Sequence, residues 1–371
     1  MPIPNEGTKE WDSEITFYIR ANQEQIKNRA KELKMQVPSY ERRMRERGIY
    51  KGQAGGFPEA EIEPVTVYTS YPKLDIKPFR EPKSNRDEED MVIVTADKHL
   101  AKVTESYNIK IATARMEKLL DSAMVIINLH RPIRRLWVFE LGDALQGENP
   151  HQGSKIGEVE CGAFEQVHEV GVPLMSRFLA SLAGGVSEVD YIAASGNHGV
   201  YDKQATKRTN WDNFLYAALR EALVNQPNIH IHPPKEFYQL VNIRGFRFFL
   251  IHGNQVYAQQ GIPLFSMRRK MQEWYAYLGG FNYGYAAHFH SGAYDQVNSH
   301  ADYTICPPLV TGDSWALERV GRASDPVQLA FGVHDRYGRT WEYKLRTDDN
   351  FMPRKFNDAE GVIEIGQGRI E

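Results

Sequence analysis

Five apolar runs of the sequence end in side chains that can bind metal ions or transfer protons. Carboxylate, amide and imidazole groups are the ligands that divalent cations such as Mn²⁺, Fe²⁺ and Zn²⁺ take in proteins. A pocket lined by such groups can activate a water molecule for hydrolysis. The runs and their closing residues are VIVTADKH with Asp97 and His99, VFELGD with Asp143, IAASGNH with Asn197 and His198, FLIHG with His252, and AAHFH with His288 and His290.

The positions of these residues predict that they share one pocket. Ligands of open α/β sheets bind at the carboxyl ends of the strands, which is where these residues fall. Alternation along an extended strand would place Asp97 and His99 on one face, and likewise His288 and His290. Each signal alone has an ordinary explanation, since a strand-end aspartate is commonly a turn residue and a buried histidine is commonly only hydrogen-bonded. The prediction depends on the whole set.

The elements that must position these residues alternate along the chain. Each of the five runs is β-branched or aromatic and predicts a buried strand. The segments between the runs are amphipathic and predict helices, which places the chain in the α/β class. After His290 the pattern becomes strand-rich. The predicted helices cover 103–128, 162–182, 210–224 and 263–278, and the later strands cover 302–310, 326–335 and 340–346.

Composition divides the chain into three zones. Residues 1–52 are helical in character, residues 53–89 read as a linker rich in proline and glycine, and residues 90–371 hold the five runs. The prolines of the linker exclude a long helix there and leave an extended stretch at Val65 to Thr69.

The first zone contains AKELKMQVPSYERRMRERGI, which resembles a helix-turn-helix. Ala30 falls where the first helix needs a small residue, Ser39 is expected to cap the second helix, and Gly48 is expected to end it. Lys34 stands where such motifs usually have glycine. The alternative is a helical hairpin with a solvated basic face. The candidate DNA contacts of the second helix are Arg42, Arg43, Arg45 and Arg47.

A second basic segment, YDKQATKRTNW, follows the GNH run. Basic side chains beside aromatic rings can hold a nucleic-acid strand and stack a base, whereas the other interpretation is a solvated loop. Its basic residues are Lys203, Lys207 and Arg208.

The composition narrows the class of protein. A net charge of −3 over 371 residues provides no overall attraction to nucleic acid, so any such binding must come from local patches. Cys161 and Cys306 are far apart, which excludes a disulfide scaffold or a cysteine-rich zinc site. The polar N-terminus and the lack of a membrane-spanning run predict a cytoplasmic protein.

In chain order, D-x-H, G-D, G-N-H, H-G and H-x-H resemble the motifs of the calcineurin-like metallophosphoesterase superfamily. Within it, the chain is most similar to DNA-repair exonucleases of the Mre11 and SbcD type and their bacteriophage relatives. The resemblance covers residues 90–290. It implies two stacked mixed β-sheets flanked by helices, with two metal ions at the strand ends.

The resemblance also implies a role for each motif residue. Three departures concern the loops: Ala287 stands where the family usually has glycine, Gly199 replaces an acidic residue, and Gln146 replaces an aspartate that commonly orients the catalytic histidine. His198 would be the general acid, and Asp143 would bridge the two ions. The implied ligands are Asp97, His99 and His290 at one ion and Asn197, His252 and His288 at the other.

These observations favour a metal-dependent phosphodiester hydrolase that uses a hydroxide activated by two ions. The leading hypothesis within this class is a DNA nuclease. The expected ion is Mn²⁺, with Fe²⁺, Zn²⁺ or Mg²⁺ as alternatives. A nucleotide or cyclic-nucleotide phosphodiesterase or phosphatase is the second hypothesis, and a DNA-binding adaptor with impaired catalysis is the third. The resemblance implies DNA, a second copy of the chain and an ATPase as partners. The ATPase would be a separate chain, since no Walker-type loop is present in this sequence. A virus-encoded chain would act in the host cytoplasm.

Overall fold

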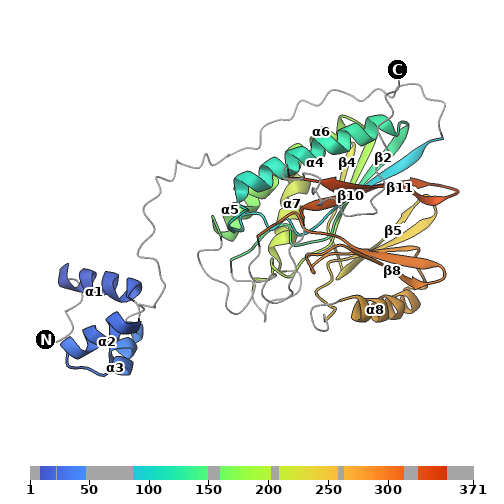
Figure 1. Cartoon of the computed structure of the whole chain (residues 1–371). Helices are drawn as coiled ribbons and strands as arrows, with labels where there is room; N and C mark the ends of the chain where they lie inside the picture. The colour runs from blue at the N-terminus through green and yellow to red at the C-terminus, as the bar shows by residue number, and fades with distance from the viewer. Residues whose placement is uncertain are drawn as a thin grey trace, which may run out of the picture. The chain divides into compact units, whose positions relative to one another are not determined.

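The computed structural model describes residues 9–21, 23–46, 87–148, 159–201, 209–257, 263–312 and 325–348. The chain forms two compact units, Met1–Val67 and Tyr68–Glu371. The linker predicted over 53–89, with its extended stretch at Val65 to Thr69, lies outside the described residues except for 87–89. In the larger unit two β-sheets are stacked and helices cover their outer faces (Figure 1). This confirms the predicted α/β fold with two mixed sheets flanked by helices.

The first sheet has six strands in the order β11-β10-β1-β2-β3-β4. Strands β1 to β4 are parallel, whereas β10 and β11 are antiparallel to their neighbours. The central strands are apolar on both faces because helices cover one face and the second sheet covers the other. The strands are β1 Glu89–Thr95, β2 Ile133–Glu140, β3 Glu188–Ala193, β4 Ile229–His232, β10 Val327–His334 and β11 Gly338–Arg346.

The second sheet has five strands in the order β5-β6-β7-β9-β8. Strands β6, β7 and β9 are parallel, and the edge strands β5 and β8 are antiparallel to their neighbours. Because the parallel strands of each sheet share a direction, their carboxyl ends lie at one edge. The strands are β5 Tyr238–Ile243, β6 Phe246–Ile251, β7 Tyr283–Ala286, β8 Ala293–Asn298 and β9 Ala301–Ile305.

Three apolar layers hold the larger unit together. One lies between the first sheet and its helices, and another lies between the second sheet and α8. The middle layer joins the two sheets, with Val92 and Phe139 from the first sheet packed with Phe248 and Tyr285 from the second. The helices are α4 Ile109–Leu129, α5 Ala163–Glu165, the π-helical turn η2 Gln166–Gly171, α6 Val172–Ala183, α7 Trp211–Ala222 and α8 Leu264–Tyr277.

Some predicted elements have different bounds. The helix predicted from residue 103 begins at Ile109, because the Asn108 side chain accepts a hydrogen bond from the Ile111 N–H at 2.9 Å and caps the helix. The helix predicted over 162–182 is interrupted by η2. Strands β4, β5 and β8 were not predicted, because they are short and carry many polar residues.

The smaller unit contains three described helices, α1 Lys9–Arg20, α2 Gln23–Glu32 and α3 Val37–Glu46. The sequence predicted only the last two as separate helices. The expected cap at Ser39 is wrong, because α3 begins at Val37 and the Ser39 N–H donates to the Gln36 carbonyl at 3.0 Å. Gly48 lies outside the described residues. The core consists of Trp11, Tyr18, Ala21, Ile26, Ala30, Leu33, Tyr40 and Met44.

The turn between α2 and α3 has the backbone conformation that usually calls for glycine. Lys34 has a φ of 52°, in the left-handed region. A short turn of this kind between two packed helices is typical of a helix-turn-helix. Arg42 and Arg43 are exposed on α3, whereas Arg47 and the side chain of Arg45 fall outside the described residues. Among the described helices of the chain, none combines the length and apolar character that crossing a membrane requires.

Candidate metal centre

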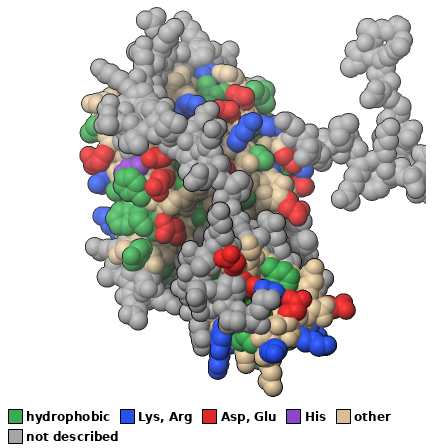
Figure 2. Space-filling model, turned by 90° about the vertical axis from the view of Figure 1, so that its left-hand side faces the viewer, with side chains coloured by type: hydrophobic (Ala, Val, Ile, Leu, Met, Phe, Trp, Pro, Cys, Tyr) green, Lys and Arg blue, Asp and Glu red, His purple; other side chains and the backbone are tan. Residues whose placement is uncertain are grey.

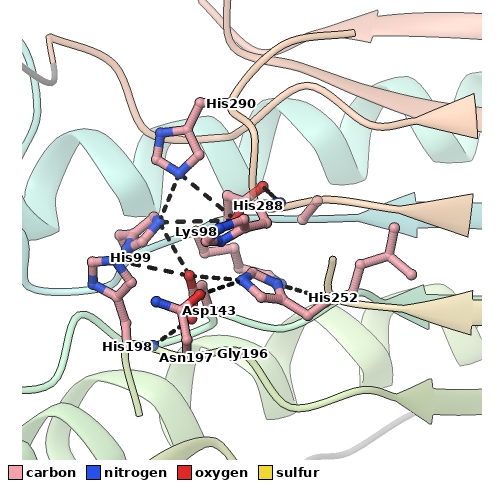
Figure 3. Close-up of polar contacts among 12 residues, drawn as sticks. Lys98, His99, Asp143, Gly196, Asn197, His198, His252, His288 and His290 are labelled. Atoms are coloured by element: carbon pink, nitrogen blue, oxygen red, sulfur yellow. Dashed lines mark hydrogen bonds and ion pairs between the residues drawn. The ribbon is translucent and has the colours of Figure 1, made fainter. Parts of the chain in front are cut away.

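The eight predicted centre residues lie at the carboxyl ends of β1, β2, β3, β6 and β7. Figure 3 shows their side chains converging from loops that belong to both sheets. Four of them, Asp97, His99, Asp143 and His252, are fully buried. The other four are partly open, with 13% of the His198 side chain and 14% of the His290 side chain exposed. The structure thus brings together Asp97, His99, Asp143, Asn197, His198, His252, His288 and His290.

The histidines and aspartates form three overlapping groups whose ligand atoms lie within 4.8 Å of one another. Asp143 belongs to two of the groups, so it lies between them. Asn197 adds its amide oxygen, which is 3.0 Å from Nε2 of His252. The groups are Asp97 with His99 and His290, His99 with Asp143 and His198, and Asp143 with His252 and His288.

The backbone of the centre differs from the extended strands that were predicted. Strand β1 ends at Thr95 and β7 ends at Ala286, so the ligand pairs lie in loops and not on alternating strand positions. Their side chains converge because the loops turn through the left-handed region, which is costly for residues other than glycine. The positive φ angles belong to Asp97 (46°), His99 (46°), Asp143 (50°), His288 (73°) and His290 (49°).

Hydrogen bonds on the outer side of two imidazoles orient them. Nδ1 of His99 lies 2.9 Å from Oε1 of Gln146, and Nδ1 of His252 lies 2.8 Å from the Leu141 carbonyl. Because both partner oxygens accept, each Nδ1 carries the proton and each Nε2 points its lone pair into the centre. Gln146 therefore contacts His99, and not His198 as the resemblance had implied.

These lone pairs face other electron-rich atoms. Nε2 of His252 is 3.0 Å from both Oδ2 of Asp143 and Oδ1 of Asn197. Nε2 of His99 is 3.1 Å from Nε2 of His290. The Oδ1 atom of Asp97 is buried and receives no hydrogen bond from any described residue. Positive charge between the donors stabilises such an arrangement, so the residues fit divalent cations.

The pKa values of the centre reflect this crowding. Burial and the nearby Asp143 raise the pKa of Asp97 to about 7. Burial alone would raise the pKa of Asp143, but His252 and His198 hold it well below its usual range. Burial and the neighbouring His252 lower the pKa of His288 to about 3. Burial alone would lower the pKa of His252, but the nearby Asp143 raises it to about 9. A cation bound between the two would take the place of that proton, because neutral histidines and ionised aspartates are the forms that bind cations.

Asp212, which the sequence interpretation missed, joins two of the ligand loops. Its buried carboxylate accepts hydrogen bonds from the backbone N–H groups of Asp143 (3.0 Å), Leu145 (3.2 Å) and Gly196 (2.9 Å). It lies in the first turn of α7, where a carboxylate interacts well with the helix dipole. In the sequence it resembles an ordinary helix-start residue after the capping Asn210, so no distinct signal identified it.

The glycine that replaces an acidic residue after His198 is explained by packing. A Cβ atom on Gly199 would lie 2.1 Å from Oδ1 of Asn210. That Asn210 side chain donates to the Gly196 carbonyl at 2.8 Å and accepts from the Asp212 N–H at 2.9 Å. The α7 N-terminus thus holds the GNH loop in place.

A buried ion pair lies beside the ligand loops. Lys98, which lies between Asp97 and His99 in sequence, pairs with Glu140, and both side chains are fully buried. The Tyr191 hydroxyl donates to the same carboxylate at 2.9 Å. Lys98 is thereby turned away from the ligand set.

The remaining candidate residues are not among the described residues of the larger unit. Lys203, Lys207 and Arg208 fall outside the described residues. Arg42 and Arg43 belong to the smaller unit. Ala287, the other departure, donates its N–H to the His252 carbonyl at 2.7 Å and links the last two histidine loops.

Comparison with known proteins places the chain among remote structural neighbours only. No protein-family model and no curated protein sequence matches it. Vps29 from Entamoeba histolytica, complexed with Zn²⁺, is 10% identical over 70% of this chain and 99% of its own, with a TM-score of 0.34. A dimetal phosphatase from Danio rerio is 12% identical over 70% of this chain and 99% of its own, with a TM-score of 0.33.

A third neighbour is a predicted phosphoesterase from Streptococcus pneumoniae. It is 9% identical over 69% of this chain and 98% of its own, with a TM-score of 0.32.

Proposed function

We propose that this chain is a two-metal phosphoester hydrolase of the calcineurin-like kind, and that it cleaves the phosphodiester bonds of DNA. The observation that carries the proposal is the convergence of lone pairs and carboxylates from five strand ends, with Asp143 shared between the groups. Nitrogen and oxygen ligands in this number fit two divalent ions better than one.

The proposed ligand sets follow the groups seen in the structure. Asp97, His99 and His290 would hold one ion. His252, His288 and Asn197 would hold the second, and Asp143 would contribute to both. When bound, such ions stabilise the charge that develops on a phosphoryl group and lower the pKa of a shared water.

His198 is suited to act on the leaving oxygen. Its Nε2 lies 4.0 Å from Oδ2 of Asp143, and its ring meets the His99 ring edge to face at a centroid distance of 4.4 Å. The backbone N–H of His198 donates to Oδ1 of Asp143 at 2.8 Å, which fixes the loop. Because the side chain is partly exposed beside the ligands, we assign it to proton donation at the mouth of the centre.

One feature supports DNA as the substrate. The smaller unit has helix-turn-helix geometry, with Arg42 and Arg43 exposed on α3. On the face that Figure 2 shows, acidic and basic side chains are interspersed, so attraction to a polyanion must come from local groups. The same centre would equally serve a nucleotide phosphodiesterase or phosphatase, which is the second candidate.

Hydrolysis assays with and without metal test the proposal. Purified protein is assayed with bis-p-nitrophenyl phosphate, 2′,3′-cyclic AMP, and labelled single- and double-stranded DNA, in Mn²⁺ and in EDTA, with Asp143→Asn as the inactive control. We expect Mn²⁺-dependent cleavage of the diester and of DNA, and none in EDTA. Cleavage confined to the cyclic nucleotide would favour the second candidate, and full activity in excess EDTA would exclude both.

A further inference from the structure

Three aromatic residues form a surface cluster directly after the GNH loop, and we call them the aromatic cluster: Tyr201, Trp211 and Phe214. The Tyr201 and Trp211 rings are 6.3 Å apart between centroids, and the Trp211 and Phe214 rings are 5.3 Å apart. Tyr201 is 68% exposed and Phe214 is 49% exposed. Trp211 is half-buried because one side of it packs on the core layer beneath α7.

The aromatic cluster is fixed to the segment that carries the proposed proton donor. The backbone N–H of Trp211 donates to the Gly199 carbonyl at 2.7 Å, and Val200 forms a β-bridge with Asn210. Tyr201 is only three positions after His198 in the chain. The rings therefore adjoin the mouth of the candidate centre and cannot move far without displacing its loop.

Exposed rings held in a fixed position beside the centre are available to stack with a flat group of a ligand. A phosphoester at the centre has a substituent on its phosphate oxygen, and that substituent must lie at the mouth. Nucleobases present a flat π-face that stacks on aromatic side chains irrespective of sequence. A rigid ring pays little conformational entropy when it stacks, which suits a residue anchored like Trp211.

We propose that the aromatic cluster stacks the nucleobase next to the scissile phosphoester, so that the substrate is a nucleotide or a nucleic-acid strand. The proposal rests on the proposed function for the position of the phosphate. It adds a binding determinant outside the metal ligands. The base is held by stacking alone, so no particular base is selected.

A pair of diester substrates separates base recognition from phosphate chemistry. Methyl p-nitrophenyl phosphate has no ring besides its leaving group, whereas thymidine 5′-p-nitrophenyl phosphate carries a base. For the double variant Tyr201→Ala with Phe214→Ala, we expect KM for the thymidine substrate to rise about tenfold, since stacking contributes about 1–3 kcal/mol per base. We expect no change for the base-free diester. The matched control removes two exposed aromatics of α8, Phe265→Ala with Tyr277→Ala, which are 73% and 84% exposed.

Equal KM changes on both substrates, or no change on either, would overturn the proposal. If the wild-type chain hydrolyses neither substrate, the proposed function fails, and a binding measurement in EDTA still tests the aromatic cluster. Thymidine monophosphate and a thymidine oligonucleotide are titrated while tryptophan fluorescence is followed, with Trp211→Phe identifying the signal of that indole. If the ligands quench the wild-type fluorescence and the double variant loses this quenching, the rings stack the base. If neither ligand quenches the wild-type fluorescence, stacking is excluded. Quenching by the oligonucleotide alone identifies a strand as the source of the base, and quenching by both identifies a single nucleotide as sufficient.

Discussion

The contact between Gln146 and His99 shows how one amide can set the chemistry of a ligand. Gln146 is nearly fully buried, and its Oε1 can only accept, so the His99 proton stays on Nδ1. The other nitrogen is then available to a cation. An aspartate at this position would add a negative charge to a region that already holds Asp97 and Asp143.

Replacing Gln146 by leucine should therefore weaken metal binding. Without the acceptor, the His99 proton is no longer held on Nδ1. Removing a hydrogen bond of this kind to a metal ligand lowers the metal affinity about 10–100-fold. Titration calorimetry with Mn²⁺ would measure the change, and Gln146→Glu, which keeps an acceptor, should bind more tightly than Gln146→Leu. Wild-type affinity in Gln146→Leu would show that His99 needs no such partner.

Replacing His198 and replacing Asp143 should lower the rate of hydrolysis in ways that depend differently on the leaving group. With p-nitrophenolate, which leaves without a proton, His198→Ala should cost little, whereas Asp143→Asn should abolish activity through metal binding. With an alcohol leaving group, His198→Ala should cost about 10²–10⁴-fold, the usual range for a general acid. Rates of p-nitrophenyl and alkyl diesters measure this, and equal losses on both would contradict a proton-donating role.

The identity of the centre residues could be predicted from the sequence, but their geometry could not. Aspartates and histidines after five apolar runs indicated one site, and all eight side chains do converge. The left-handed turns at Asp97 and His288 were not foreseeable, because such conformations are unfavourable locally and depend on tertiary contacts. The role of Asp212 could not be predicted either, because it depends on tertiary contacts with three backbone N–H groups that are remote in sequence.

At the scale of elements, α7 acts as a scaffold for two ligand loops. Removing the Asp212 carboxylate would leave three buried N–H groups without acceptors, at about 1–3 kcal/mol each. We expect Asp212→Ala to lower the free energy of unfolding by about 3 kcal/mol or more, as measured in urea. The exposed Asp121→Ala on α4 serves as the control, and a loss no larger than its own would rule out this scaffold role.

The elements themselves were largely predictable where their pattern was strong. The five ligand-bearing strands and the long amphipathic helices were predicted, because burial on one or both faces imposes a clear periodicity. Strand β4, with the sequence IHIH, was not, because it is short and its histidines pair with Glu188 and Asp190 of β3. Pairing across a sheet is a tertiary effect that a short segment does not reveal.

In the smaller unit, the contact between α1 and its neighbours should depend on pH. Burial alone would raise the pKa of Glu14, but hydrogen bonds from Arg29 and Tyr40 outweigh it, so the pKa is lowered from its ordinary 4.5. A carboxyl with a lowered folded pKa contributes stability above its unfolded pKa and loses it as the pH falls through the folded value. The smaller unit should therefore become less stable below about pH 4.5.

Methyl NMR of the full chain would measure this, because Met44 is buried in the same unit. Its native signal should melt at lower temperature as the pH falls towards 3. Glu14→Gln should remove the dependence, and the exposed Glu24→Gln on α2 should keep it. An identical pH response in Glu14→Gln and the wild type would contradict the assignment.

At the scale of the whole molecule, the proposed function assigns the chemistry to the larger unit and the attraction to the substrate to the smaller one. If α3 contacts phosphates, the DNA affinity of the full chain should fall steeply with salt. Arg43→Ala should lower the slope of log affinity against log salt by about 1. The exposed Arg177→Ala on α6 is the control, and fluorescence anisotropy with duplex DNA is the measurement. An unchanged slope in Arg43→Ala would remove Arg43 from the DNA contacts.

The centre also has a mechanical consequence, because each proposed ion would be held by residues of both sheets. Asp97 and His99 follow a strand of the first sheet, and His290 follows a strand of the second, with His99 and His290 191 positions apart in the chain. An ion there would act as a removable cross-link between the two halves of the sandwich, closing a very long loop. The sheets of the loaded protein could not separate without releasing it. With the apolar layer between the sheets still in place, chelation would remove this cross-link and make local separation of the sheets, and thus proteolysis, faster.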